Sequence, residues 1–281
     1  KIKAVIRELS TNAYDAHIEV GKGDEPFLVH LPNRFEPNFY IRDYGTGLSH
    51  EDCMNLYTTY FGSTKTDSND AIGCLGLGSK SPFAYTDSFT VTSYFNGEKR
   101  VYNSFKNEHD EPVFVLLSEE ASDEVNGIEV MLSVAEYDVE EFKDKAQEIY
   151  QYFKVIPKFD DDTEIVVPEY LLKGSIWGLQ AKDDKRGYHQ SFEAGAIMGQ
   201  VRYPIDVDQI EDSSVKNLLN SGVEIHFDIG DLDITPSRES LSYNEYTKKN
   251  IIETCGYVIE EMTEVLQENF DDCESLYSAR V

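Results

Sequence analysis

The first part of the chain passes from a helical to an extended pattern of hydrophobic positions. Apolar residues recur at helical spacing from residue 2 to residue 17: Val5, Leu9, Ala13 and Ala16. This pattern predicts an amphipathic helix with a small, closely packing face. Short apolar runs at 27–31 and 38–42 predict strands. The polar and glycine-rich residues 62–78 predict a mobile loop that leads into the N-terminus of a helix.

The rest of the chain predicts further strands and helices. Strands are predicted at 88–94, 100–105, 112–117 and 127–134, joined by turn residues as in an antiparallel meander, and residues 139–153 return to helical spacing. The acidic run 160–162 is typical of a solvated turn at a domain boundary. Beyond it, strands around Ile165, at 197–203 and at 223–228 alternate with helical patterns at 213–219 and 243–266. We therefore expect two α/β domains, residues 1–158 and 159–281.

Composition and charge narrow the classes of protein. Of the 281 residues 40% are hydrophobic, which favours a packed core over disorder. There are 25 Lys and Arg against 53 Asp and Glu, so the formal net charge is −28, which disfavours direct binding to nucleic acid or to an anionic membrane surface. No apolar stretch approaches the ~20 residues of a transmembrane helix. The four cysteines show no CxxC pairing and are expected to be reduced thiols of a cytoplasmic protein.

Three sequence patterns contain residues that could bind a ligand or catalyse a reaction. Glu8, Asn12 and Asp15 lie at i, i+4 and i+7, along one stripe of the first predicted helix. A polar stripe is ordinarily the solvent-facing side of a helix, but the small residues that flank this one indicate close packing around a cavity. The segment 43–47, Asp-Tyr-Gly-Thr-Gly, follows a predicted strand and combines a carboxylate with glycines that let a ligand approach the backbone; a tight turn is the alternative.

The third pattern consists of the glycines Gly73, Gly76 and Gly78. Spaced glycines before a helix expose backbone N–H groups that can bind phosphate. The Walker A spacing GxxxxGK[ST] is absent, and GxxGxG differs from the dinucleotide-binding fingerprint GxGxxG. These two nucleotide-binding motifs are therefore excluded.

Together the three patterns resemble the N, G1 and G2 boxes of the GHKL ATPases, the superfamily of DNA gyrase, the ninety-kilodalton heat-shock chaperones, histidine kinases and the MutL mismatch-repair proteins. The segment 232–241 resembles the chaperone middle-domain segment that delivers an arginine to the γ-phosphate. Segments 79–89, 234–241 and 247–253 resemble more closely the rIIA lysis-inhibition protein family of T-even phages. The resemblance implies an α+β protein, with a Bergerat-type ATP-binding sandwich followed by a smaller domain like domain two of ribosomal protein S5.

The resemblance also implies a role for each matching residue, with ATP and Mg²⁺ as the cofactors. Glu8 would be the general base, Asn12 the Mg²⁺ ligand, Asp15 a residue that orders water beside adenine, and Asp43 the acceptor for the adenine amine. The remaining candidates would make room for the base, donate to the phosphates or reach them: Gly45, Gly47, Lys65, Gly73, Gly76, Gly78, Ser79 and Arg238. An ordinary surface lysine is the alternative for Lys65, and a salt bridge with Glu239 is the alternative for Arg238.

Two features depart from the family pattern. Ile128 follows Gly127 where many members carry Thr, so the adenine-side water network lacks that hydroxyl. The chain also begins without Met and directly in a helical pattern, so we expect an upstream extension to be missing. In dimeric relatives that extension supports hydrolysis, and turnover by this truncated form is expected to be slow or absent.

The implied function is a Mg²⁺-dependent ATP-binding and hydrolysing conformational switch that acts through protein partners, with a nucleotide-dependent homodimer as a further expectation. A nucleotide-binding pseudo-ATPase scaffold is the alternative. The charge of −28 counts against a DNA-processing ATPase, and the 232–241 segment counts against a histidine kinase. The histidines show no HExxH or similar spacing, so no zinc site is expected. The resemblance alone implies a cytoplasmic location, in the host if the protein is phage-encoded, with any membrane association made through a partner.

Overall fold

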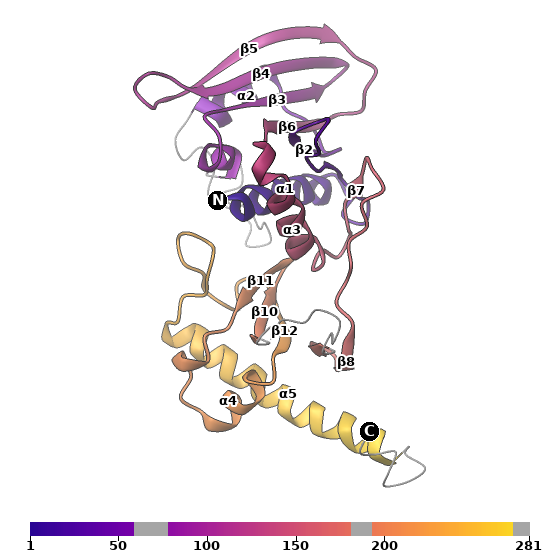
Figure 1. Ribbon diagram of the computed structural model, residues 1–281, viewed down its shortest axis with the longest axis vertical. Helices are drawn as coiled ribbons and strands as arrows, with labels where there is room; N and C mark the ends of the chain where they lie inside the picture. Colours follow the sequence, from indigo (N-terminus) through magenta and orange to yellow (C-terminus); the bar gives the residue numbers. More distant parts are fainter. Residues whose placement is uncertain (59–77, 181–192, 272–281) are drawn as a thin grey trace. The chain divides into compact units, whose positions relative to one another are not determined.

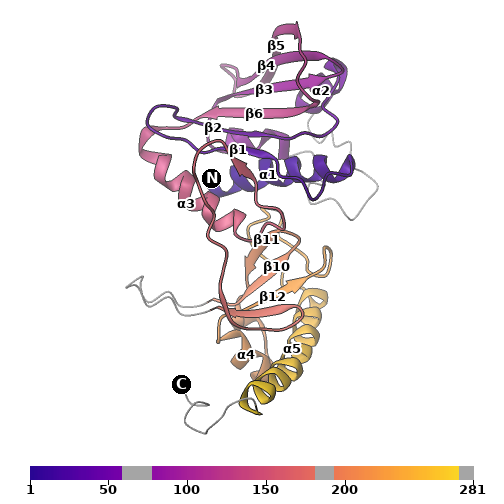
Figure 2. The same cartoon turned by 90° about the vertical axis from the view of Figure 1, so that its right-hand side faces the viewer.

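The computed structural model describes residues 1–58, 78–180 and 193–271 (Figures 1 and 2). The chain divides into two units, Lys1–Val166 and Val167–Val281, and each contains helices and its own mixed β-sheet. The protein is therefore of the predicted α+β class. The predicted division after residue 158 precedes the observed one, because residues 158–159 pair with a strand of the first unit and Ile165 packs against its core.

The first unit builds a seven-stranded sheet. Its elements are α1 (Ile2–Glu19), β1 (Leu28–His30), β2 (Asn38–Arg42), α2 (His50–Thr58), η1 (Gly78–Ala84), β3 (Ser88–Phe95), β4 (Glu98–Lys106), β5 (Pro112–Ala121), β6 (Gly127–Ser133), η2 (Glu136–Asp138), α3 (Val139–Tyr150) and β7 (Lys158–Phe159). The strand order is β5-β4-β3-β6-β2-β1-β7. All neighbours are antiparallel except β1 and β7. β3, β4 and β5 form the predicted meander, but β6 pairs with β3 and not with β5, so the four-strand meander was wrong.

One face of this sheet forms the core with the helices. Alternate strand residues such as Ile41, Val91 and Val130 lie in register across β2, β3 and β6, which puts them on the same face. They belong to one buried cluster with residues of α1, α2 and α3, and Figure 2 shows α1 and α3 along this sheet. The predicted helix at 2–17 is thus confirmed as α1, whose apolar residues pack on the sheet.

The acidic run 160–162 lies in an exposed bend, as predicted for a solvated turn, and Asp160 also contacts residues of the first unit. Asp160 Oδ2 lies 2.8 Å from His30 Nδ1, and it accepts a 2.8 Å hydrogen bond from the Tyr40 hydroxyl. The His30 and Tyr40 rings stack with centroids 4.9 Å apart. Asp160 therefore fastens the chain that follows β7 to the adjacent strands β1 and β2, and the first unit continues beyond the predicted boundary.

The second unit has a five-stranded sheet backed by two helices. Its elements are β8 (Tyr170–Lys173), β9 (Trp177–Gln180), β10 (Gly195–Met198), β11 (Val201–Pro204), η3 (Val207–Gln209), α4 (Ser213–Leu219), β12 (Val223–Phe227) and α5 (Glu245–Asp271). The strand order is β11-β10-β12-β9-β8. On α5, Ile251, Cys255 and Val258 are fully buried at i, i+4 and i+7, and they join the core of this unit. Trp177 is a core residue, as expected, at 3% exposure.

Several local predictions fail. The expected strand at 197–203 is the hairpin β10–β11, because Gly199 adopts φ 64° and turns the chain. Ile165 lies in no strand and instead packs on the first core. The helix predicted after the glycine-rich segment, in contrast, is confirmed as η1, a 3₁₀ helix that contains Pro82. The structure adds α2, β8 and β9, which the sequence pattern did not predict.

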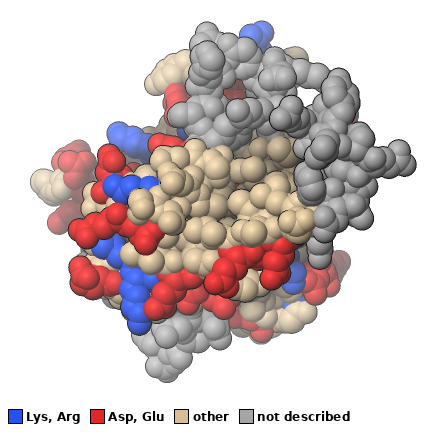
Figure 3. Space-filling view, turned by 90° about the horizontal axis from the view of Figure 1, so that it is seen from below, with Lys and Arg blue, Asp and Glu red and all other residues tan. Residues whose placement is uncertain are grey.

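The surface charge, the hydropathy of the helices and the cysteines of the structure can be compared with the expectations from composition. Acidic side chains cover more of the face shown in Figure 3 than basic ones do, around an uncharged central area. In the parts of the chain that the structure describes, no helix is both long and apolar enough to cross a membrane. Cys53 and Cys255, the described cysteines, are buried free thiols.

The core of the first unit yields a stability prediction. Phe142 of α3 is fully buried and packs against Phe39 and Tyr85, with ring centroids 5.2 Å away in each case. Phe142→Ala is expected to lower the free energy of unfolding by roughly 3–5 kcal/mol. Phe35→Ala is the matched control, because Phe35 is 97% exposed and its loss should cost little. Urea denaturation of both variants measures the difference, and equal effects would contradict this core assignment.

Candidate functional site

The stripe of α1 that carries the candidate residues is not a solvent-facing surface. Glu8 has a side chain only 12% exposed, Asn12 is half-buried and Asp15 is 4% exposed. Within α1 only Ile18 and Glu19 are exposed. The stripe is therefore packed within the unit and not on its solvent-facing surface, and the cavity beside it stays a prediction.

Glu8 has a cationic neighbour. Arg7 Nη2 donates to Glu8 Oε1 over 3.3 Å, and the Arg7 side chain is only 6% exposed. The carboxylate thus carries a nearly buried guanidinium beside it. Such a pair is screened little by water, so it orients Glu8 within the unit.

The helix α1, which carries the first pattern, contacts the elements next to the other two in the part of the chain that the structure describes. α1 contacts both β2, which runs into Asp43, and η1, which begins at Gly78 and Ser79. These contacts are not evident from the sequence, because β2 ends at Arg42 and η1 begins only at Gly78. Lys65, Gly73 and Gly76 lie outside the described residues, and their roles stay predictions.

Asp43 is held by the neighbouring strand β6. Its Oδ1 accepts hydrogen bonds from the backbone N–H groups of Gly45, at 2.9 Å, and Ile128, at 3.2 Å. Its own N–H donates to the Ile128 carbonyl oxygen over 2.9 Å. The carboxylate is 7% exposed. Two backbone donors to one oxygen fix its orientation, as recognition of a flat base requires.

Close backbone approaches explain the glycines of this loop. A Cβ on Gly45 would lie 2.9 Å from the Ala16 Cβ of α1. A Cβ on Gly47, whose φ is +72°, would lie 2.2 Å from the Tyr94 carbonyl oxygen, and one on Gly127 would lie 2.0 Å from the Asp43 carbonyl oxygen. The small residue Ala16 and these glycines therefore seat the loop against α1, β3 and β6.

Side chains that sequence reasoning missed hold the same loop. The Tyr44 N–H donates to His17 Nε2 over 2.8 Å, and Lys22 Nζ donates to the Tyr44 carbonyl oxygen over 3.0 Å. The buried Ser93 hydroxyl donates to the Leu48 carbonyl oxygen at 2.7 Å and accepts from the Leu48 N–H at 3.1 Å. No local sequence signal marks these residues, because each acts on a backbone group far along the chain.

The helix η1 brings two further polar side chains that the sequence did not single out. Burial lowers the pKa of Lys80 below its ordinary value. The Ser81 Oγ is buried and has no hydrogen-bond partner among the residues that the structure describes. A buried hydroxyl without a partner is costly, and a ligand that bonds to it would remove that cost.

Arg238 lies in the second unit, at the tip of a tight loop. Its φ of 57° is in the left-handed region, which non-glycine residues seldom occupy. The loop is closed by an Ile234–Leu241 bridge, and the Arg238 N–H donates to the Thr235 carbonyl oxygen at 2.8 Å. Backbone strain of this kind collects at functional sites, although the role of Arg238 toward the first unit stays a prediction.

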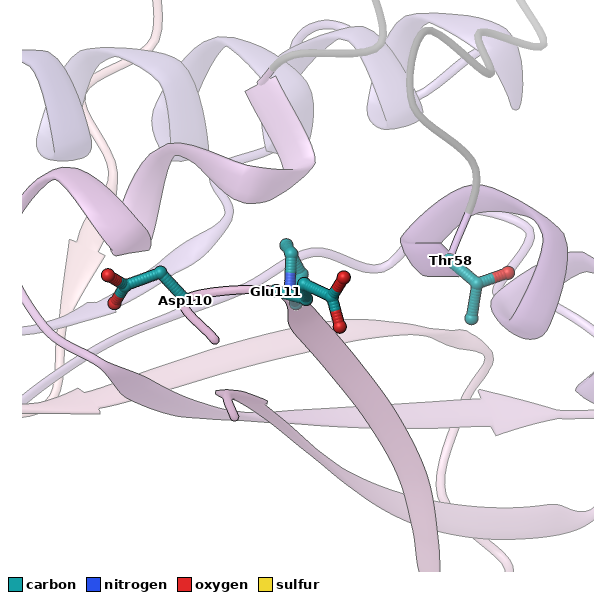
Figure 4. Close-up of a pocket in the computed structure, with 4 residues that line it drawn as sticks. Thr58, Asp110 and Glu111 are labelled. Atoms are coloured by element: carbon teal, nitrogen blue, oxygen red, sulfur yellow. The ribbon is translucent and has the colours of Figure 1, made fainter. Parts of the chain in front are cut away.

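A pocket of about 420 Å³ lies elsewhere in the first unit. Among the described residues its lining comprises Thr58, Asp110, Glu111 and Pro112. Figure 4 shows Thr58 at the end of α2, and Asp110 and Glu111 beside the start of β5. None of the predicted site residues that the structure describes is among these lining residues. The described residues also contain no group of three or more His, Cys, Asp or Glu side chains placed to hold a metal ion.

The tight seat of the loop can be tested at Gly47. Gly47→Ala is expected to lower the free energy of unfolding by about 3 kcal/mol or more, because the new methyl group meets the Tyr94 carbonyl oxygen in addition to the left-handed strain. Gly97→Ala is the matched control: Gly97 has φ +82° and nothing within 4 Å of an added Cβ, so about 1 kcal/mol of strain is expected. Thermal unfolding compares the two, and equal losses would show that the loop yields easily.

Comparison with known proteins adds no assignment to this geometry. No protein-family model matches the chain, and no curated protein matches it. The contacts of α1 with the loop that follows β2 and with η1 are therefore the observations on which a function has to rest.

Proposed function

We propose that the protein is a Mg²⁺-dependent ATP-binding and hydrolysing conformational switch of the GHKL type. In this proposal the first unit is a Bergerat-type nucleotide domain, the second is a domain like domain two of ribosomal protein S5, and the whole belongs to an rIIA-like family that acts through protein partners. The observation that carries the proposal is that α1, which bears Glu8 and Asn12, contacts both β2, which runs into Asp43, and η1, which begins at Gly78.

The base-binding side of the proposed site is the Asp43 loop. The Asp43 carboxylate is buried and oriented through Oδ1, and it is an acceptor that suits the exocyclic amine of adenine. Guanine presents a carbonyl acceptor at the corresponding position, so a carboxylate there selects adenine. Gly45 and Gly47 keep the backbone close to its supports and leave no side chain of their own in the site.

The phosphate side is formed by α1 and η1. Glu8 and Asn12 are one helical turn apart on α1 and mostly buried, so they are sheltered from bulk water. Glu8 is the proposed base for the attacking water, and Asn12 is the proposed oxygen ligand for Mg²⁺, which takes few protein ligands and completes its shell with waters and phosphate oxygens. Backbone N–H groups at the start of η1, with Lys80 and Ser81, supply donors for phosphate.

One observation favours the alternative of a scaffold that binds nucleotide without hydrolysis. Arg7 donates to Glu8 Oε1, so this carboxylate oxygen is already engaged by a guanidinium, whereas a general base needs an oxygen within hydrogen-bond reach of the attacking water. Both versions work through protein partners, because a net charge of −28 opposes direct contact with nucleic acid. Binding and turnover therefore have to be measured separately.

The binding prediction concerns Asp43. Isothermal titration of the wild type with ADP and with a non-hydrolysable ATP analogue in Mg²⁺ is expected to show binding, and Asp43→Asn is expected to raise the Kd about 10- to 100-fold. Asn can keep the Oδ1 hydrogen bonds to Gly45 and Ile128, while an amide NH₂ replaces the second acceptor oxygen.

The matched control for Asp43 is Asp160→Asn in the same unit, which changes a carboxylate that bonds to His30 and Tyr40. Its Kd should equal that of the wild type. A folded wild type that binds neither nucleotide would overturn the proposed function.

The turnover prediction concerns Glu8. Under single-turnover conditions Glu8→Gln is expected to slow hydrolysis about 100-fold or more with little change in nucleotide Kd, because it removes the base but preserves the shape of the side chain. Glu19→Gln, at the exposed end of the same helix, should hydrolyse like the wild type. Tight binding by a wild type that shows no hydrolysis would leave the scaffold version in place of the ATPase.

A further inference from the structure

The backbone of Tyr44 is held on both sides by side chains from another part of the chain. Its N–H donates to His17 Nε2 over 2.8 Å, and its carbonyl oxygen accepts from Lys22 Nζ over 3.0 Å. His17 is at the end of α1 and Lys22 is in the turn that follows. We call these two side chains the Tyr44 clamp. Tyr44 lies between Asp43 and Gly45, whose N–H orients the Asp43 carboxylate, so the clamp fixes the peptides on both sides of it.

The hydrogen bonds define the tautomer of His17. Because Nε2 accepts from the Tyr44 N–H, it carries no proton, and Nδ1, 3.0 Å from the Glu25 carbonyl oxygen, is the donor to that oxygen. The ring is fully buried. It is nearly perpendicular to the Phe27 ring, at a centroid distance of 6.3 Å, and tilted against the Tyr44 ring at 5.9 Å. Only the neutral ring satisfies both partners, since a protonated Nε2 would point its hydrogen at the Tyr44 N–H.

The surroundings of His17 favour this neutral form. Burial lowers the pKa of His17 below its ordinary value of about 6.5, and the Lys22 ammonium lowers it further, while the Glu25 carbonyl and carboxylate act in the opposite sense. A group with a lowered folded-state pKa keeps its full contribution above pH 6.5 and loses it as the pH falls through the folded-state value. The clamp is thus intact at neutral pH and opens only when the pH falls through the lowered pKa of His17.

We propose that His17 and Lys22 are positioning residues that hold the Tyr44 peptide, and through it the Asp43 carboxylate, in the orientation required to bind the adenine base. This inference rests on the proposed nucleotide site and adds residues outside its sequence motifs. It predicts that adenine-nucleotide affinity depends on the neutral Nε2 acceptor of His17, although His17 itself need not touch the nucleotide.

Two substitutions separate the role of His17 as a hydrogen-bond acceptor from the protonation of its ring. His17→Gln offers an amide oxygen near the position of Nε2 and does not titrate, whereas His17→Ala removes the acceptor. The Kd of the Mg²⁺ complex of a non-hydrolysable ATP analogue is measured by calorimetry at pH 7.5, 6.5 and 5.5. At pH 7.5 the Gln variant should bind within about twofold of the wild type, and the Ala variant about tenfold more weakly. As the pH falls through the His17 pKa, the wild type should weaken relative to Gln and approach the affinity of the Ala variant.

The controls distinguish this inference from the proposed function. The terminal phosphate of the ligand titrates in the same range, and the Gln variant reports that contribution alone. An Ala variant that binds like the wild type and Gln would overturn the positioning role while the nucleotide site stands. If the folded wild type binds no nucleotide, hydrogen exchange still tests the clamp: the Tyr44 amide should exchange slowly in wild type and Gln and quickly in Ala. Fast exchange in the wild type at pH 7.5 would refute the clamp itself.

Discussion

The close contact between Gly45 and Ala16 is the constraint on which the candidate site depends. It lets the loop after β2 lie directly on α1, where a side chain at residue 45 would come within 2.9 Å of Ala16. Once the backbones are this close, His17 can reach the Tyr44 N–H and Asp43 can receive the donors of Gly45 and Ile128. The loop is therefore ordered by hydrogen bonds before any ligand arrives, which reduces the entropy that binding must remove.

The net charge of the molecule, unlike the ordered loop, opposes the binding of an anionic ligand. An excess of acidic residues gives a net charge of −28, which repels a polyanion such as a nucleoside triphosphate at long range. A site for such a ligand has to act at short range, through backbone N–H groups, a metal ion and a few cations. Two cationic side chains of the first unit could act at such short range: the half-buried Lys80 in η1 and Arg7 on α1.

Sequence pattern was informative where burial is periodic and local. Helix α1, strand β2 and helix α4 could be predicted because their apolar spacing is regular. Helix α2 buries only Cys53 and Tyr57, and β8 has no fully buried residue, so neither leaves a clear pattern. The polar stripe and the glycine loop were visible in the sequence, whereas His17, Lys22 and Ser93 were not, since their partners are backbone atoms of distant residues.

The pairing of β7 with β1 has a mechanical consequence. β7 comprises two residues, it is the one strand parallel to its neighbour in the described part of the first sheet, and the chain continues from it toward the second unit. Tension applied through that connection would load the two-residue ladder and the bonds of Asp160 to His30 and Tyr40 before any longer strand. Because β1 is the neighbour of β2, this short β1–β7 pairing lies one strand away from the strand that leads into Asp43.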